Sequence, residues 1–512
     1  MSDLVTLSDD QSEAYDAVAD LLGSTGLDLI SGDLGSVGAV QRTISVIGKA
    51  GSGKTLLLAQ LVKDLKAAGL ATAGGEYEAR SKKSPRSFSV LAPTNKAASV
   101  LRHRGVPATT LHRIIYTPVY DPEYEKIAEW LTDGGDAPQI EELDQVALDH
   151  IQRFYDETES VIGALTAVGL KGSDFITGWK RRDDPLDIGF VDEASMLDTR
   201  QLEDLKEIFS TLVLFGDPAQ LAPVNQSGSL VFETLPDDHI YRLSRVHRQT
   251  QDNPILDLAH SLADPTLDFQ DFEDQISQIA KQDDRVIWAE RVNVDLISRS
   301  PVLVWRNATR IRLINAYRAA YEASETELIP GEPMICDGIE LSPKNRAKRI
   351  DLEARGLVKG AQVVYLGPGK KRAFSRLHII GAEDPRVSAA SIIKIEKPDD
   401  EDPFVPYAAQ QGAIFLHGAA VTIHKAQGSQ WENVQVFAPD IYAAARAGRV
   451  EAGQPLWKRL AYVAITRAQE RLYWVVRNRL SLPTQPLSTD DLKAPAPKFE
   501  LSAQDDLMPP QS

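Results

Sequence analysis

A short run of glycine, lysine and threonine near the start of the chain has the composition of a phosphate-binding loop. The run comprises Gly48, Lys49, Ala50, Gly51, Ser52, Gly53, Lys54 and Thr55. It matches the pattern G-x-x-x-x-G-K-[ST], after a predicted strand over 43–47 and before a predicted helix over 55–68. Glycines let backbone N–H groups face phosphates at a helix N-terminus. Lys54 is expected to reach the β- and γ-phosphates, and Thr55 to bind Mg²⁺.

Two carboxylates end an apolar strand further along the chain. Asp192 and Glu193 follow the run 188–191, so Asp192 is expected to bind Mg²⁺ through water. Glu193 is expected to polarise the attacking water. Gln220 follows the next predicted strand, where an amide can sense the γ-phosphate, although Gly-Asp-Pro at 216–218 is by itself only a turn.

Strands and helices alternate around these residues, which predicts an α/β fold with parallel sheets. A second α/β unit begins near residue 243 and contains a stretch of short β-like runs, read as an inserted β-barrel. The predicted parts are 1–118 with 181–242 as the first domain, 119–180 as a largely helical insertion, 243–330 with 418–482 as the second domain, 331–417 as the barrel, and 483–512 as a disordered, Pro-rich tail.

Composition sets further limits on the class of protein. The 512 residues are 43% hydrophobic and 25% charged, which excludes wholesale disorder. A net charge of −17 excludes a basic coat, but a local basic groove remains possible. The single cysteine, Cys336, allows no intrachain disulfide. Without a signal peptide or a long apolar run, the chain is expected to be cytoplasmic and not membrane-bound.

An ordered series of motifs resembles that of the superfamily 1 helicases, closest to the RecD-like and Dda-like branch. The segments are 7–11, 48–55, 92–98, 110–112, 191–196, 216–224, 248–249, 421–428 and 462–468. The resemblance covers about residues 7 to 477. It implies two RecA-like domains with ATP between them, an SH3-like barrel, and single-stranded DNA crossing both domains with 5′-to-3′ movement.

The resemblance also implies roles for individual residues. Arg248 and Arg467 would reach the γ-phosphate from the second domain, Gln11 would read the adenine edge, and Gly428 would lie at the nucleotide. DNA contacts would come from Pro93 and from small polar and cationic side chains: Thr94, Asn95, Lys96, Thr110, His112, Thr422, His424 and Lys425. Asn307, which follows a predicted strand end facing the cleft, is a possible DNA contact. Arg310 is a further possible contact.

Simpler readings of several residues stay open. Gln11 is alternatively an exposed glutamine at a helix start, and Thr110 a helix cap. His112 is alternatively a satisfied, partly buried histidine. Trp305 could stack a base, but a tryptophan ending an apolar strand is more often part of the core.

Two departures from the family pattern bear on function. Gln430 stands where the 3′-to-5′ branch commonly has glutamate, which favours the RecD-like branch. The insertion 119–180 occupies the place of a strand-separating β-hairpin but reads as longer and helical, so no pin-tip residue can be named.

The sequence therefore predicts an ATP- and Mg²⁺-dependent helicase acting on single-stranded and tailed duplex DNA, in repair, recombination or replication. An RNA helicase and a non-unwinding ATPase motor subunit, with the Pro-rich tail binding a protein partner, remain as alternatives.

Overall fold

The computed structural model describes most of the chain. The described residues are 7–29, 42–73, 86–120, 122–138, 144–158, 164, 168, 176–181, 186–221, 231–244, 253–324, 326–341, 346–382, 384–397, 409, 411–451, 453–489 and 492. Predictions on Arg248, on 222–224 and on most of the tail lie outside these residues.

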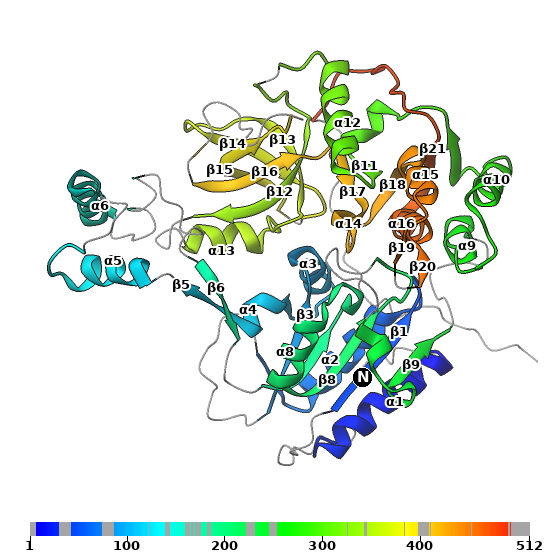
Figure 1. The fold of residues 1–512 in the computed structure, drawn as a ribbon, viewed down its shortest axis with the longest axis horizontal. Helices are drawn as coiled ribbons and strands as arrows, with labels where there is room; N and C mark the ends of the chain where they lie inside the picture. Colours follow the sequence, from blue (N-terminus) through cyan, green and yellow to red (C-terminus); the bar gives the residue numbers. More distant parts are fainter. Residues whose placement is uncertain are drawn as a thin grey trace, which may run out of the picture.

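The first sheet contains the strands predicted around the phosphate-binding loop. Its strands run parallel in the order β2-β3-β7-β8-β1-β9, with β4 beside β3. They are β1 (Arg42–Gly48), β2 (Ala71–Thr72), β3 (Ser87–Ala92), β4 (Ala108–Thr110), β7 (Leu186–Val191), β8 (Phe209–Gly216) and β9 (Ile240–Leu243). β7, β8 and β1 are neighbouring parallel strands, so Asp192, Gly216 and Gly48 at their carboxyl ends lie at the same end of this sheet. Figure 1 shows the sheet with its helices.

Helices cover both faces of this first domain. One core joins the sheet to α1 (Asp9–Ser24), α2 (Lys54–Ala67) and α3 (Asn95–His103). The opposite core contains α4 (Leu111–Ile115) and α8 (Thr199–Ile208). All six residues of β7 are buried, because helices cover the strand from both sides.

The second domain repeats this arrangement around a parallel sheet of order β10-β21-β18-β11-β17. Its strands are β10 (Val286–Ala289), β11 (Val302–Val304), β17 (Ala420–Thr422), β18 (Trp431–Phe437) and β21 (Ala468–Val475). One face packs on α9 (Pro254–Ser261), α10 (Phe269–Ile279), α14 (Ile423–Ala426), α15 (Ala438–Arg446) and α16 (Leu456–Ile465), the other on α11 (Val294–Ile297) and α12 (Asn307–Ala320). Two covered parallel sheets confirm the predicted α/β class.

A closed five-stranded barrel lies between α12 and β17 in the chain. It consists of β12 (Pro333–Glu340), β13 (Gln362–Pro368), β14 (Phe374–Ile379), β15 (Arg386–Lys394) and β16 (Gly412–His417), with α13 (Arg346–Ala354) beside its core. This closed barrel lies within the range 331–417 in which the sequence predicts an inserted β-barrel. The likeness of this barrel to an SH3 domain stays a prediction.

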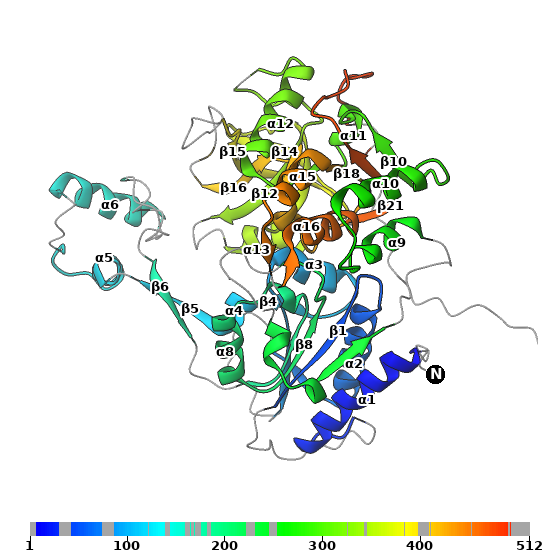
Figure 2. The ribbon, with the colours of Figure 1, turned by 45° about the vertical axis from the view of Figure 1, so that its right-hand side comes forward.

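The insertion is built differently from the helical segment that the sequence predicted. Strands β5 (Tyr116–Tyr120) and β6 (Ile176–Arg181) pair antiparallel. The chain between these strands forms the helices α5 (Pro122–Asp133) and α6 (Gln145–Thr158). Figures 1 and 2 both show α5 and α6 standing away from the two sheets at the end of this ribbon. The helices share a small core that includes Ile127, Trp130 and Ile151. No described helix is long and apolar enough to cross a membrane.

The start of the predicted disordered tail is ordered, which corrects that prediction for residues 483–489. Thr484 donates its hydroxyl to an Asp295 Oδ2 atom 2.7 Å away, and Arg299 donates to the Ser488 carbonyl at 3.1 Å. Leu487 packs on the second domain's core. The proline-rich composition of this segment indicated disorder. The contacts that order it could not be predicted from the sequence, because their partners lie 189 residues earlier in the chain.

A buried ion pair joins β3 to β7 in the first domain. Arg86 donates to both carboxylate oxygens of Asp187, at 2.7 and 3.1 Å, and to the Thr25 carbonyl. Replacing Arg86 with methionine is expected to lower the free energy of unfolding by about 3 kcal/mol, since it leaves a buried carboxylate unpaired. Urea unfolding measures this. The control is Arg349→Met, which breaks an exposed ion pair with Glu353 on one helix. It should lower the free energy of unfolding by less than about 0.5 kcal/mol. Equal losses would refute the prediction.

Candidate functional site

The phosphate-binding loop has the backbone that its glycines predict. β1 ends at Gly48 and α2 begins at Lys54. Gly51 and Gly53 have φ of 89° and 83°, a left-handed conformation that other residues rarely adopt. A Cβ on Gly48 would lie 2.4 Å from Ser52 Oγ, so only glycine fits there. The loop therefore depends on glycine at three of its positions.

Polar groups of the loop are arranged to hold an anion. The Lys54 ammonium donates to the Gly48 and Lys49 carbonyls, the latter at 3.1 Å, and so lies over the loop. Ser52 Oγ is buried and has no hydrogen-bond partner among the described residues. A buried hydroxyl without a partner is costly, and a phosphate oxygen would satisfy it. These residues fit the phosphates of a nucleotide.

The two predicted catalytic carboxylates lie at the end of β7. Burial, and then the Glu193 carboxylate, raise the pKa of Asp192 to about 7, while Lys54 acts in the opposite direction. Lys54 is therefore close to this carboxylate. Glu193 has φ of 54°, and such strained backbone gathers at functional sites.

The chemistry of these groups fits Mg²⁺ bound together with phosphates. The described residues contain no group of three or more His, Cys, Asp or Glu side chains that could hold a metal alone. Mg²⁺ is usually bound by one or two protein oxygens together with substrate phosphates and water. Asp192 and the Thr55 hydroxyl would supply the protein oxygens, and a cation there would also stabilise the buried Asp192 carboxylate beside the half-buried Glu193 carboxylate.

The turn after β8 is held by side chains of the second domain. Gln220 is buried, and its Oε1 accepts a 3.5 Å hydrogen bond from Ser195 Oγ. Arg459 of α16 donates to the Gln220 carbonyl, and Gln427 donates to the Leu221 carbonyl at 3.2 Å. The sequence singled out Gln220 but gave Arg459 no role.

Arg467 approaches the first domain's carboxylates from the second domain. Burial lowers the pKa of Arg467, whereas Glu193, Tyr462 and Asp217 raise it, so these groups lie near its guanidinium. Its nitrogens donate to the Val463 and Ser429 carbonyls at 3.0 and 3.2 Å, which fixes its orientation. Arg248, the other predicted arginine, lies outside the described residues.

Tyr462 is a residue for which the sequence suggested no separate function. Its hydroxyl accepts a 3.0 Å hydrogen bond from the Ala50 amide of the loop and donates at 2.7 Å to Asp217 Oδ2. Both Tyr462 and Asp217 are buried. The available signal was their membership of the motif segments 462–468 and 216–224.

Gln11 is placed against the loop by the start of α1. Its Oε1 accepts from the Ser8 amide at 3.0 Å, and its Nε2 donates to the Ser52 carbonyl at 3.1 Å. Only 1% of Gln11 is exposed, so the alternative of an exposed glutamine is wrong. The amide fixes α1 on the loop, and adenine recognition stays a prediction.

The segment before β18 in the second domain packs against the N-terminus of α3 through Gly428. Thr94 caps α3 by accepting from the Ala97 amide at 3.1 Å. A Cβ on Gly428 would lie 3.8 Å from Thr94 Oγ1 and 3.6 Å from Ala97 Cβ. Gly428 therefore packs on α3, and its assignment to the nucleotide stays a prediction. The same short segment contains three predicted DNA contacts before Gly428. They are Thr422, which caps α14, His424 and Lys425.

Lys96 lies where three parts of the molecule meet. Its ammonium is 5.6 Å from the centre of the Trp431 ring, and a Cβ on Gly360 of the α13–β13 loop would lie 3.5 Å from Lys96 Cβ. Burial lowers the pKa of Lys96 to about 8. The adjacent Pro93 and Asn95 are half-buried. A cation at this junction suits a phosphate between the domains.

The remaining candidates of the first domain lie near α4. Thr110 occupies the cap position of α4 but makes no capping hydrogen bond through its side chain. His112 is exposed, with its ring 5.3 Å from that of Tyr116. The DNA contacts predicted for Thr110 and His112 stay predictions.

One suggested DNA contact is wrong. Arg310 is only 5% exposed, and its guanidinium pairs with Glu396 of the barrel and with Asn307 Oδ1, the latter at 2.7 Å. Asn307 itself is exposed, and its predicted DNA contact stays a prediction. Trp305 is half-buried against the second core, as the simpler reading expected, and Arg449 covers its ring at 5.5 Å.

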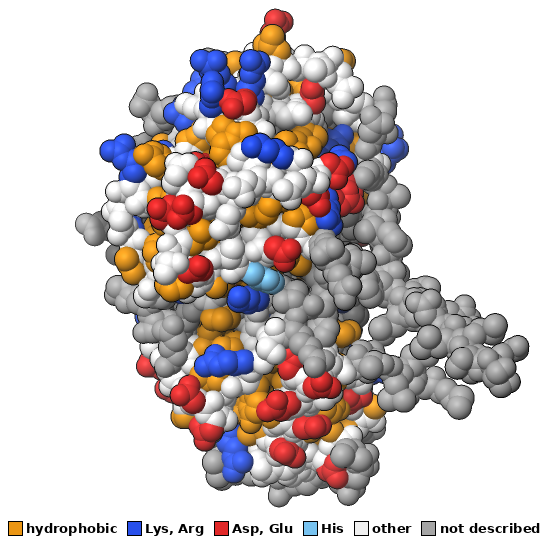
Figure 3. Space-filling view, turned by 90° about the vertical axis from the view of Figure 1, so that its right-hand side faces the viewer, with side chains coloured by type: hydrophobic (Ala, Val, Ile, Leu, Met, Phe, Trp, Pro, Cys, Tyr) orange, Lys and Arg blue, Asp and Glu red, His pale blue; other side chains and the backbone are white. Residues whose placement is uncertain are grey.

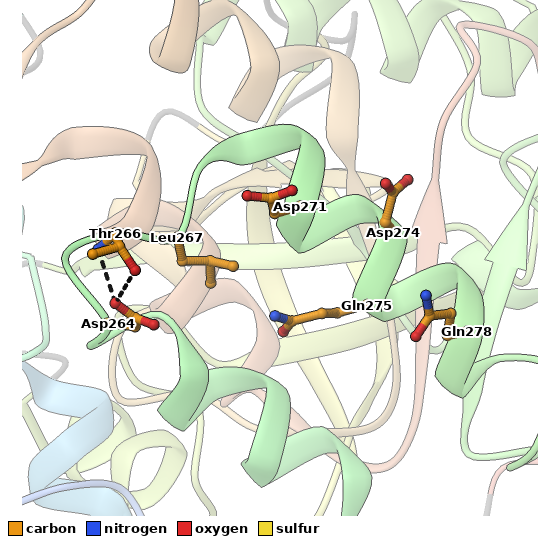
Figure 4. Close-up of a pocket in the computed structure, with 7 residues that line it drawn as sticks. All are labelled: Asp264, Thr266, Leu267, Asp271, Asp274, Gln275 and Gln278. Carbon is orange, nitrogen blue, oxygen red and sulfur yellow. Dashed lines mark hydrogen bonds between the residues drawn. The ribbon is translucent and has the colours of Figure 1, made fainter.

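Other surface features do not overlap with this site. A pocket of about 420 Å³ lies beside α10 and the loop before it (Figure 4). It is lined by Asp264, Thr266, Leu267, Asp271, Asp274, Gln275 and Gln278, none of them a predicted site residue. The face in Figure 3 mixes basic with acidic side chains, and its described residues form no continuous basic surface.

Comparisons with known proteins give two family matches and several distant relatives. Residues 37–289 match the AAA domain, and residues 417–475 match the UvrD-like helicase C-terminal domain. The conjugal transfer protein TraA of Agrobacterium fabrum is 24% identical over 327 residues, which cover 59% of this chain and 26% of TraA. The chain thus spans about a quarter of that relative's length.

Solved structures of Pif1 helicases have a similar but distant arrangement. The Bacteroides Pif1 complex with ADP-AlF3 and single-stranded DNA is 13% identical, with a TM-score of 0.46 and coverage of 94% of this chain and 95% of that chain. Pif1 from Candida albicans is 16% identical, with a TM-score of 0.45 and coverage of 93% and 96%.

The two family matches fall where the ordered motifs predict them. The AAA match contains the loop at 48–55 and the carboxylates at 192–193, and the UvrD-like match contains the segments 421–428 and 462–468. The geometry brings these segments together at one site. These two matches and this geometry support the resemblance to the superfamily 1 helicases.

Proposed function

We propose that the chain is an ATP- and Mg²⁺-dependent DNA helicase that moves along single-stranded DNA. The observation that carries this proposal is the position of α16, which brings Tyr462 onto the loop and Arg467 toward Glu193. A nucleotide site assembled from two domains makes hydrolysis depend on how the domains are placed. The same closure would change the spacing of nucleic-acid contacts on the two domains.

The candidate DNA contacts support a strand that crosses both domains. Thr94 and Lys96 of the first domain lie close to Gly428 and Trp431 of the second. Hydroxyls, amides and cations bind phosphates without reading bases, as a translocating protein requires. A few such contacts are enough, so a net charge of −17 is compatible with DNA binding.

Movement from 5′ to 3′ and a role in repair, recombination or replication in the cytoplasm form the finer part of the proposal. The RecD-like order of motifs and Gln430 support the polarity. In this reading Lys54 holds the terminal phosphates, Glu193 orients water, and Arg467 stabilises charge on the transferring phosphoryl group.

Duplexes with one single-stranded tail test this function directly. We expect unwinding of a 5′-tailed duplex and little or none of a 3′-tailed duplex, both in the presence of ATP and Mg²⁺. ATP hydrolysis stimulated by DNA oligomers and weakly by RNA oligomers would exclude the RNA helicase. Unwinding from the 3′ tail alone would overturn the polarity, and no stimulation by either nucleic acid would overturn the proposal.

A translocase that needs a partner to separate strands is the second candidate. It is favoured by the insertion, whose β5–β6 ribbon ends in α5 and α6 rather than in a short hairpin tip. A protein partner could also bind the Pro-rich end of the chain. Stimulated hydrolysis without unwinding from either tail, and loss of a co-purified protein when residues 490–512 are removed, would support this candidate.

A further inference from the structure

Side chains of the second domain converge on one short segment of the first, residues 217–221. Tyr462 donates to the Asp217 carboxylate, Arg459 to the Gln220 carbonyl, and Gln427 to the Leu221 carbonyl. All three donors are buried. We call residues 217–221 the coupling turn. Because these hydrogen bonds hold it, a movement of α16 or of the segment before β18 would displace the coupling turn.

The coupling turn also contacts the segment that follows the catalytic carboxylate Glu193, and it is linked to the phosphate-binding loop. Through Ser195, whose Oγ donates to Gln220 Oε1, it contacts the short helix that follows Glu193. Through Tyr462 it is linked to the loop, because the same hydroxyl accepts from the Ala50 amide. One phenolic oxygen thus joins the loop, the coupling turn and α16.

We propose that Tyr462 is a positioning residue that couples the loop to the coupling turn and so ties the rate of ATP hydrolysis to the placement of the second domain. This inference rests on the proposed function. Tyr462 does not supply a charge or a proton to the reaction. It holds Ala50 and Asp217 at a fixed separation, so that Gln220 and Glu193 keep their places beside the phosphates.

The geometry predicts which kinetic constant depends on this hydroxyl. Lys54 and the amides of the loop remain when Tyr462 is replaced by phenylalanine, so ATP should still bind. The coupling turn, however, loses a buried hydrogen bond to a carboxylate, and such bonds correspond to factors of roughly 10 to 100. We expect Tyr462→Phe to lower the DNA-stimulated kcat about tenfold or more, with KM for ATP changed by less than about threefold.

Tyr15→Phe is a closely matched control. The Tyr15 hydroxyl also donates to a carboxylate, Asp64 Oδ2, at 2.7 Å, but both residues lie within the first domain on α1 and α2. Each variant is made in the full chain and measured for kcat and KM with and without single-stranded DNA. Tyr15→Phe should keep wild-type kinetics. Equal losses of kcat in the two variants, in step with equal losses of thermal stability, would show a structural role only.

A double variant tests whether Tyr462 acts through Asp217. If it does, adding Tyr462→Phe to an Asp217→Asn variant should lower the DNA-stimulated kcat by clearly less than tenfold, because the charged acceptor is already gone. If the losses of kcat in the two single variants multiply fully in the double variant, Tyr462 does not act through Asp217 and the proposed coupling is wrong. A raised KM with unchanged kcat would also overturn it and make Tyr462 a nucleotide-binding residue.

Hydrogen exchange separates failure of this inference from failure of the proposed function, because it needs no turnover. Tyr462→Phe should speed amide exchange in peptides covering the loop at 48–53 and the coupling turn at 217–221, and Tyr15→Phe should speed neither. Unchanged exchange in both peptides would refute the coupling even if the wild-type chain hydrolyses ATP. Faster exchange in a chain that lacks DNA-stimulated hydrolysis would support the coupling and refute the helicase.

Discussion

Replacement of Lys54 with alanine is expected to lower kcat for ATP hydrolysis about a thousandfold or more. The Lys54 ammonium lies over the loop and is close enough to Asp192 to affect its pKa. Removing one preorganised donor from a site that stabilises developing charge costs about 10²–10³ in rate, and this donor is also a full charge. Steady-state hydrolysis with saturating DNA and Mg²⁺ measures the loss.

Folding should be little affected by this change. Lys54 is half-buried, and among the described residues its ammonium donates to loop carbonyls, so the unfolding temperature should shift by no more than about 2 °C. Lys63→Ala provides the control, because Lys63 is an exposed lysine on the same helix. Wild-type turnover in Lys54→Ala would refute the assignment of the loop as the phosphate site.

Arg467→Ala is expected to lower kcat about a thousandfold or more while ATP binding persists. An arginine that reaches transferring phosphate from a second domain contributes roughly 10³–10⁵ in rate. The Glu193 and Asp217 carboxylates raise the pKa of this guanidinium, so it lies within electrostatic range of the first domain's carboxylates. Single-turnover hydrolysis together with the affinity for ADP distinguishes slow chemistry from weak binding.

Two further variants make the Arg467 result specific. Arg467→Lys should recover little activity, because an ammonium cannot reproduce the fixed geometry by which the guanidinium bonds to Val463 and Ser429. Arg471→Ala removes a half-exposed arginine on β21 and should leave kcat unchanged. A loss of ATP affinity as large as the loss of kcat would contradict a role confined to the chemical step.

The parts of the site that could be predicted from the sequence are those whose signals are local. The loop has all its fixed residues within eight positions, and β7 ends in two carboxylates directly after an apolar run. Local patterns of this kind determine backbone shape, which is why the glycines at 51 and 53 have the expected left-handed conformation. The alternation of strands and helices was enough to predict both parallel sheets.

Contacts between distant segments could not be predicted from the sequence. Tyr462 and Ala50 are 412 residues apart, and nothing near either residue indicates their hydrogen bond. Arg310 was a possible DNA contact in the sequence, but its guanidinium pairs with Glu396, 86 residues later. In the insertion, helical spacing indicated α5 and α6, whereas β5 finds its partner strand only after both helices. In each case pairing or burial, rather than local preference, decides the outcome.

The strand order of the second sheet has a consequence for how the chain is made. β10 pairs with β21, about 190 residues later, and β11 lies between β17 and β18, which follow the whole barrel. At 5–20 residues per second, a ribosome needs roughly 10–40 s to supply the partner of β10. During that time the first sheet and then the barrel have all their strands, while β10 and β11 wait with unpaired edges. Newly made chains should therefore be most vulnerable to aggregation and to proteases between residues 286 and 304 until β17, β18 and β21 have been made.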